Sequence, residues 1–165
     1  MPHIHERYDF VVSAFIVHRG KVLLVYHNSY DEWLPIGGHI ELDEDPEEAL
    51  YREIREECGL KVRVLASRRP RIAHRGVKPL PTPDFMDVHC AHGGRCSASV
   101  HRKNRHRHIA FVYFGTAAGD RVKLHAREHR EYRWLSRADL GRPEFRLTRS
   151  IRFYCREALK RAARP

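Results

Sequence analysis

The sequence predicts an α/β fold, a one-domain sandwich built from strands and two helices. Three observations lead to it. Runs of β-branched and aromatic residues of strand length recur along the chain, two segments carry helical signals, and 165 residues suit one domain with its own core. No internal repeat or linker composition divides the sequence, so we expect a single domain over residues 1–165.

The first predicted elements form a hairpin. Tyr8–Val17 is rich in β-branched and aromatic residues and predicts a buried strand, and Lys21–His27 predicts a second strand after a turn at His18–Gly20. The segment Trp33–Gly38 then predicts a tight, glycine-rich connection. We expect His39–Leu42 to follow it as a short extended piece.

A helix with clear end signals is predicted next. Asp45 can cap its N-terminus and Pro46 suits the first helical position, while the two glutamates that follow favour the positive end of the helix dipole. We expect this helix to run to Cys58 and to end at Gly59, a residue suited to the left-handed C-terminal position.

The second half of the chain adds further strands and a second helix. Ala91–Arg107 is polar and rich in His and Arg, so it predicts a loop insertion at about 91–107. Arg149–Ala163 predicts a basic amphipathic helix. The strands predicted in this half are Lys61–Leu65, Asp84–Cys90, His108–Thr116 and Glu131–Leu135.

Composition excludes several classes of protein. With 42% hydrophobic and 10% aromatic residues, the chain is not disordered, and it has no apolar run of about 18 residues that could span a bilayer. The apolar run near the N-terminus follows Glu6 and Asp9 and lacks a small-residue cleavage site, so it predicts a strand rather than a signal peptide. We therefore expect a cytoplasmic protein without a membrane partner.

The acidic residues are concentrated in one segment of a basic chain. Nine of the 21 acids lie between Glu41 and Glu57. With Arg52 and Arg55 counted, this segment carries −7, which leaves +17 on the rest of a chain whose total is +10. Such a distribution predicts a cation held at the acidic segment for an anionic substrate.

Three carboxylates in that segment share one face of the predicted helix. Glu53, Glu56 and Glu57 have i, i+3, i+4 spacing, so their charges repel unless something neutralises them. A hard divalent cation such as Mg²⁺ does so, because it prefers carboxylates, waters and substrate phosphates. Arg52 can pair with one of the acids and orient it. The alternative is a solvated acidic helix face with no ligand.

The spacing from Gly38 to Leu60 resembles the Nudix box at every specified position. Gly38 is followed after five residues by Glu44, and after seven more by Arg52-Glu53-Ile54-Arg55-Glu56-Glu57-Cys58-Gly59-Leu60. The resemblance implies an α/β/α sandwich with a mixed sheet between helices. It also implies a hydrolase that uses Mg²⁺ or Mn²⁺ to cleave a diphosphate linked to some moiety X.

The resemblance also implies a role for each matching residue. The metal ligands would be Glu53, Glu56, Glu57 and the Gly37 carbonyl. Arg52 and Glu44 would form a supporting pair that orients the metal-binding acids, and Gly38 and Gly59 would serve loop geometry and helix termination. Many family members recruit a base from a late loop, here His125–Glu131, with Glu128 as first candidate and Glu131 as second. The implied catalytic set is Arg52, Glu53, Glu56, Glu57 and Glu128.

Three functions remain open at this stage. The first is hydrolysis of a small nucleotide-type substrate, such as a nucleoside triphosphate or ADP-ribose. The second is a pyrophosphohydrolase acting on RNA 5′ ends, which the basic surroundings allow but no RNA-binding motif favours. The third is a non-catalytic Nudix-fold nucleotide sensor, against which the intact box argues. Homodimers are common in the family, so a homodimer is also an open alternative.

The histidine-rich region carries a separate hypothesis. Cys90 and Cys96, with nearby histidines, offer soft ligand types for structural zinc, although their spacing does not match a paired zinc ribbon. His106 and His108 point to the same face of a strand, a face that could meet the substrate cleft. We expect the remaining cysteines to be reduced thiols.

Overall fold

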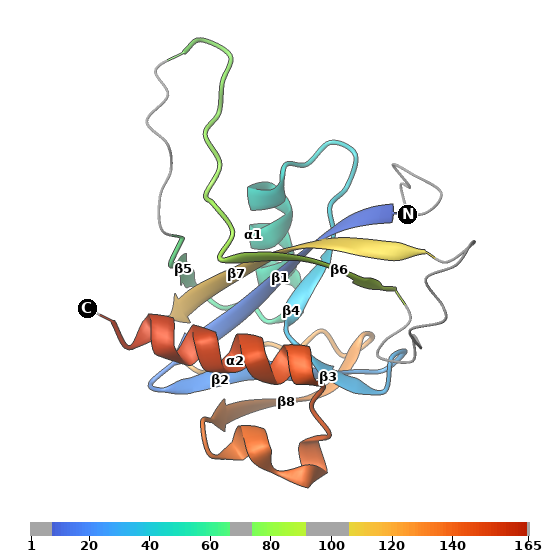
Figure 1. Ribbon diagram of the computed structural model, residues 1–165, viewed down its shortest axis with the longest axis vertical. Helices are drawn as coiled ribbons and strands as arrows, with labels where there is room; N and C mark the ends of the chain where they lie inside the picture. Colours follow the sequence, from blue (N-terminus) through green and yellow to red (C-terminus); the bar gives the residue numbers. More distant parts are fainter. Residues whose placement is uncertain (1–7, 67–73, 92–105, 165) are drawn as a thin grey trace.

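One sheet of eight strands organises the residues that the computed structural model describes, 8–66, 74–91 and 106–164. Helix α1 (Pro46–Glu57) packs on one face of the sheet and helix α2 (Arg149–Ala162) on the other (Figure 1). This arrangement confirms the α/β/α sandwich. The strands are β1 (Tyr8–His18), β2 (Lys21–His27), β3 (Glu32–Leu34), β4 (Ile36–His39), β5 (Val62–Val64), β6 (Phe85–Cys90), β7 (Arg107–Ala117) and β8 (His129–Ser136), and the short helices η3 (Asp139–Gly141) and η4 (Pro143–Phe145) precede α2.

The centre of the sheet is the parallel pair β1 and β7. Their register runs from Tyr8↔Arg107 to Val17↔Thr116. The other pairings among the described strands are antiparallel: β1 pairs with β2 and β4, β2 with β3 and β8, and β7 with β5 and β6. The sheet is therefore mixed, as the resemblance implies.

Alternation along β1 divides the core between the two helices. Phe15 is buried on the α2 face in the same cluster as Cys155. Its neighbour Ile16 is buried on the α1 face with Leu50 and Ile54. Because successive strand residues point to opposite faces, β1 reads as a nearly continuous apolar run that supplies both halves of the core.

Helix α1 has the end signals that the sequence predicts. The Asp45 carboxylate accepts hydrogen bonds from the backbone N–H groups of Glu47 and Glu48, and the Glu48 side chain accepts one from the Asp45 N–H at 2.9 Å. This capping box fixes the start of the helix. The helix ends at Glu57, one residue before the predicted end, and Gly59 has the expected positive φ of 64°.

Strands β3 and β4 lie where the sequence predicts a glycine-rich connection and an extended piece at 33–42. Strand β4 hydrogen-bonds to β1, with Val12 opposite Gly38 and Ser13 opposite Gly37. A Cβ at Gly37 would overlap the Val12 carbonyl oxygen, so the two backbones approach closely only because glycine stands there. Strand β8 begins at His129, two residues before the predicted start, because backbone pairing with β2 extends beyond the apolar part of the segment.

The cysteines fall into two groups. Cys58 and Cys155 are buried free thiols, as expected. Cys90 is disulfide-bonded, so it does not offer the thiolate that a zinc site would need. Residues 92–105 of the predicted insertion, including Cys96, lie outside the described residues. Within the described part of the chain, no helix is long and apolar enough to cross a membrane.

Candidate active site

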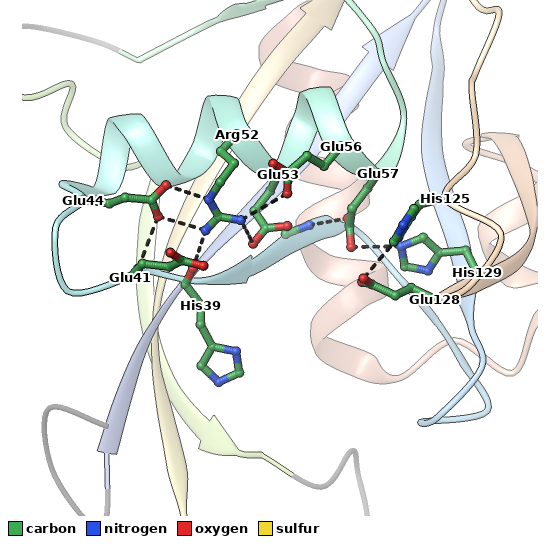
Figure 2. Close-up of polar contacts among 11 residues, drawn as sticks. His39, Glu41, Glu44, Arg52, Glu53, Glu56, Glu57, His125, Glu128 and His129 are labelled. Atoms are coloured by element: carbon green, nitrogen blue, oxygen red, sulfur yellow. Dashed lines mark hydrogen bonds and ion pairs between the residues drawn. The ribbon is translucent and has the colours of Figure 1, made fainter. Parts of the chain in front are cut away.

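Arg52 connects Glu44, which precedes α1, to the acidic face of that helix. Its guanidinium donates to both oxygens of Glu44, from Nε to Oε1 at 2.6 Å and from Nη2 to Oε2 at 2.9 Å (Figure 2). Nη1 donates to Oε1 of Glu53 at 2.7 Å, and Nη2 also donates to the His39 carbonyl at 2.9 Å. The planar fork of arginine is suited to serving several acceptors in this way.

Glu44 and Arg52 stabilise each other's charged forms. The hydrogen bond from Arg52 lowers the pKa of Glu44, and the one to Glu44 raises the pKa of Arg52 above its usual range. Glu56 lies on the same side, with its Oε2 3.6 Å from Nη1 of Arg52 and its side chain 52% exposed. The structure thus brings together Glu44, Arg52, Glu53 and Glu56. Arg52 also hydrogen-bonds to the backbone of β4.

Glu53 lies against Gly38 of β4. A Cβ on Gly38 would overlap the carboxylate of Glu53, so the absence of a side chain at Gly38 makes room for this acid. Burial raises the pKa of Glu53 to about 7; the Arg52 hydrogen bond opposes this effect, and the charges of Glu57 and Glu56 reinforce it. A carboxyl in this state is favoured as an anion when a cation is nearby.

Glu57 is the most enclosed of the helix carboxylates. Its Oε2 accepts a hydrogen bond from the Gly37 N–H at 3.0 Å, and its Oε1 lies 2.9 Å from Nε2 of His129. The side chains of Glu57 and His129 are only 4% and 1% exposed. Gly37 therefore contacts the acid through its amide, a contact that the sequence analysis did not foresee.

His129 is the site residue that sequence reasoning missed. It lies at the first position of β8, opposite His27 on β2, and its ring is buried against Glu57. No sequence pattern singles it out, because it precedes the apolar part of the strand. The one available signal is its position directly after Glu128, in the late loop already suspected of supplying a base.

Glu128 and Glu131 diverge in the structure. Ligand atoms of Glu57, Glu128 and His129 all lie within 4.8 Å of one another, so the first base candidate reaches the site. Glu128 is 49% exposed, and its Oε1 lies 3.1 Å from Nδ1 of His125 (Figure 2). Glu131, the second candidate, instead pairs with Arg133 at 2.7 Å.

The donor set fits a hard divalent cation. Mg²⁺ and Mn²⁺ prefer carboxylate oxygens such as those on adjacent turns of α1, and the Glu128 carboxylate lies beside that of Glu57. The close spacing of several acids, one of them with a raised pKa, is also what a bound cation would stabilise.

Comparisons with known proteins agree with this geometry. The family model of the NUDIX domain matches residues 7–156. A solved NUDIX-family hydrolase from Clostridium perfringens is 34% identical, with 92% of this chain and 96% of that chain covered and a TM-score of 0.72. The MutT protein of Methanosarcina mazei Go1 is 20% identical, with 98% and 100% covered and a TM-score of 0.61. An ADP-ribose pyrophosphatase from Streptococcus suis 89-1591 is 18% identical, with 94% and 92% covered and a TM-score of 0.54. No curated protein matches the chain.

The fold and the carboxylate-bearing helix define a phosphoanhydride hydrolase. The chain belongs to the Nudix family, and it is a pyrophosphohydrolase enzyme. Nudix hydrolases generally use a divalent metal and act on small nucleotide-type substrates, and the chain carries a carboxylate and histidine group that could hold such an ion.

Proposed function

We propose that the protein is a Mg²⁺- or Mn²⁺-dependent hydrolase that cleaves the diphosphate linkage of a nucleoside diphosphate joined to a second group X. The observation that carries this proposal is the placement of Glu57, buried between the Gly37 amide and His129 beside two further helix acids. A carboxylate so fixed is a pre-oriented metal ligand. The single domain that performs this reaction extends over residues 1–165.

The proposed ligands are Glu53, Glu56 and Glu57 of α1 with the Gly37 carbonyl. When bound, the cation would offset charge on the phosphates and lower the pKa of a bound water.

The neighbouring residues hold these ligands in place. Arg52 holds Glu53 and, through Glu44 and the His39 carbonyl, fixes the loop in front of the helix. His129 donates to Glu57 and keeps that carboxylate aimed at the site. Gly38 and Gly59 supply the room and the helix end that the ligands need.

Glu128 is the proposed general base. It is the half-exposed acid of the group, so it can both meet a water and release the proton to solvent. The nearby ring of His125 orients its carboxylate. Water would attack one phosphorus of the diphosphate while Glu128 takes a proton from that water. The bond from this phosphorus to the bridging oxygen then breaks, the bridging oxygen leaves with the other phosphate, and both phosphate-containing products are released.

The names of solved relatives support this substrate class without choosing X. They include a UDP-X diphosphatase, a dihydroneopterin triphosphate pyrophosphohydrolase and an ADP-ribose pyrophosphatase. The compounds in these three names each contain a phosphate anhydride next to an organic group. The basic residues outside the acidic helix segment suit such an anionic substrate.

The test is a substrate panel with a matched variant pair. Purified protein is assayed on nucleoside triphosphates, nucleotide sugars, ADP-ribose, dinucleoside polyphosphates and 5′-triphosphate RNA, each with Mg²⁺, Mn²⁺ or EDTA. We expect metal-dependent cleavage of one class that is abolished in Glu57→Gln and retained in Glu144→Gln, which removes an exposed surface carboxylate. Binding without turnover across the panel would overturn the proposal in favour of a sensor, and cleavage of RNA alone would assign the RNA-end reaction.

A further inference from the structure

A second group of metal-ligand side chains lies apart from the carboxylates of α1. It consists of Asp9 on β1, His39 at the end of β4, His106 directly before β7 and His108 on β7. One ligand atom from each lies within 4.8 Å of the others. Asp9 and His108 are 3% and 8% exposed, so the group is built into the fold rather than displayed on its surface.

The strand register explains why these four side chains converge. Asp9 lies opposite His108 in the parallel pair, and His39 lies opposite Val11 in the antiparallel pair. Residues paired across strands point to the same face, and so do residues two apart on one strand. Val11 belongs to the core cluster on the α2 face, so the four side chains gather on that face.

The group is therefore separated from the proposed catalytic centre by the sheet itself. Gly38 opens toward Glu53 on the α1 face, whereas the ring of the next residue, His39, points away from α1 (Figure 2). The backbone of His39 connects the two centres, because the His39 carbonyl accepts a hydrogen bond from Arg52. The face shared by His106 and His108 is thus opposite the acidic helix, and the hypothesis that it meets the substrate cleft stays a prediction.

We propose that Asp9, His39, His106 and His108 form a tetrahedral site for a zinc-class transition metal ion. Three imidazole nitrogens and one carboxylate oxygen suit Zn²⁺ and not Mg²⁺, which prefers oxygen ligands. Tetrahedral bonds of the usual zinc length place donor atoms about 3.3 Å apart. Oδ2 of Asp9 lies 2.8 Å from Nε2 of His106 and 3.4 Å from Nε2 of His39, close to this spacing.

The histidine rings of the group pack around His108. Its ring centroid lies 5.0 Å from that of His39 and 5.5 Å from that of His106, and both contacts are edge-on. His89 packs against His108 at 5.3 Å between ring centroids, but its Nδ1 contacts Asp87 at 2.7 Å, which makes it a neighbour of the site rather than a fifth ligand.

Four protein ligands complete a zinc shell and leave no open position for a reacting water. The site is therefore structural: it joins β1, β4 and β7 at one end of the sheet. Since β4 also presents the His39 carbonyl to Arg52, a filled site holds the edge of the Nudix box in place. This inference is independent of the proposed substrate class.

The test measures metal binding directly and needs no activity. Full-length protein without a histidine tag is loaded with Zn²⁺ or Co²⁺, passed through a desalting column and analysed by elemental analysis and visible absorption. We expect one equivalent of metal per chain and the intense visible bands of tetrahedral Co²⁺, without thiolate charge-transfer bands. Zn²⁺ should also raise the Tm of protein that has been stripped with a chelator.

Variants distinguish this site from the catalytic one. His106→Gln replaces a ligand that is 23% exposed and should lose the bound equivalent and the Co²⁺ bands, whereas Glu57→Gln and the exposed control His74→Gln should keep both. Equal Tm of His106→Gln and wild type in EDTA shows that the variant is folded. Absence of a bound equivalent in wild type, or its loss in Glu57→Gln with retention in His106→Gln, would overturn the proposal. If His106→Gln does not fold, the wild-type Co²⁺ spectrum alone decides.

Discussion

Nε2 of His129 and Oε1 of Glu57 lie 2.9 Å apart in a contact that is almost sealed from solvent. Among the described residues, the other ring nitrogen of His129, Nδ1, is buried without a hydrogen-bond partner. Among these residues, the imidazole therefore makes its side-chain hydrogen bond to Glu57 alone. We interpret His129 as a positioning residue that holds Glu57 for the metal.

Replacing His129 tests this interpretation. His129→Leu fills a similar volume but removes the hydrogen-bond donor, so the Glu57 carboxylate loses the partner that orients it. We expect metal affinity or activity to fall by about 10–100-fold, as for other residues that orient metal ligands. The measurement is the Mg²⁺ concentration for half-maximal activity, with His74→Gln as the control. An unchanged metal requirement would remove His129 from the positioning role.

Gly38→Ala should separate activity from stability. The new Cβ overlaps the Glu53 carboxylate, which is the end of a side chain and can move aside. We therefore expect a Tm close to that of wild type and a fall in kcat of at least about tenfold, because a misplaced ligand weakens catalysis strongly. Gly119→Ala is the control, since its Cβ meets nothing within 4 Å. Full activity in Gly38→Ala would show that Glu53 need not occupy its present position.

Arg52→Lys should disable the connection between Glu44, Glu53 and β4. A lysine ammonium cannot reproduce the planar fork that serves these acceptors together. We expect kcat to fall by about 10–100-fold and the free energy of unfolding by about 1–3 kcal/mol. Kinetics and urea denaturation measure the two effects. Arg55→Lys, at an exposed position of the same helix, should change neither.

Glu128→Gln addresses the proposed base. The amide cannot take a proton from water, so kcat should fall by about 10²–10⁴-fold. The Mg²⁺ requirement should change little, because the helix acids remain. Glu131→Gln is the matched control on the adjoining strand, where the acid pairs with Arg133. A fall in kcat only for Glu131→Gln would reassign the base.

The contact between Tyr154 and Asp87 predicts a pH-dependent stability. The Tyr154 hydroxyl donates to Oδ2 of Asp87 at 2.6 Å and ties α2 to β6. Burial alone would raise the pKa of Asp87, but hydrogen bonds from His89 and Tyr154 outweigh it, so the folded pKa is lowered. The stabilisation is therefore present above the unfolded pKa, about 3.9, and is lost as pH falls through the folded value.

Tyr154→Phe should consequently lower the free energy of unfolding by about 1–3 kcal/mol at pH 7. The difference from wild type should begin to shrink below the unfolded pKa of about 3.9 and should be lost as pH falls through the lowered pKa of folded Asp87. Urea denaturation at pH 7 and pH 3 measures it, with Tyr30→Phe as the control at an exposed position. A difference that stays constant across this range would exclude the carboxylate as the source.

Local signals in the sequence were sufficient for one side of the site. Asp45, Pro46 and Gly59 mark the ends of α1, and the helical period alone puts Glu53, Glu56 and Glu57 on one face. The resemblance to the Nudix box adds the pairing of Arg52 with Glu44, and the structure brings the two together.

The other side of the site depends on long-range register, which no local pattern contains. His129 meets Glu57 because β8 pairs with β2 from its first residue, and Gly37 meets it because β4 pairs with β1. Likewise, Asp9 and His39 approach His108 only through two different strand pairings. A one-residue slip in either pairing would send these side chains to the opposite face.

The parallel pairing of β1 with β7 also constrains how the chain folds. Tyr8 lies opposite Arg107, 99 positions later, and every further pair in this register keeps the same separation. The first hairpin and α1 can form early from local contacts, but the middle of the sheet closes only after a large loop has been brought together. During synthesis, the apolar faces of β1 must therefore wait for β7 to emerge, and this interval is when the nascent chain is most exposed to aggregation.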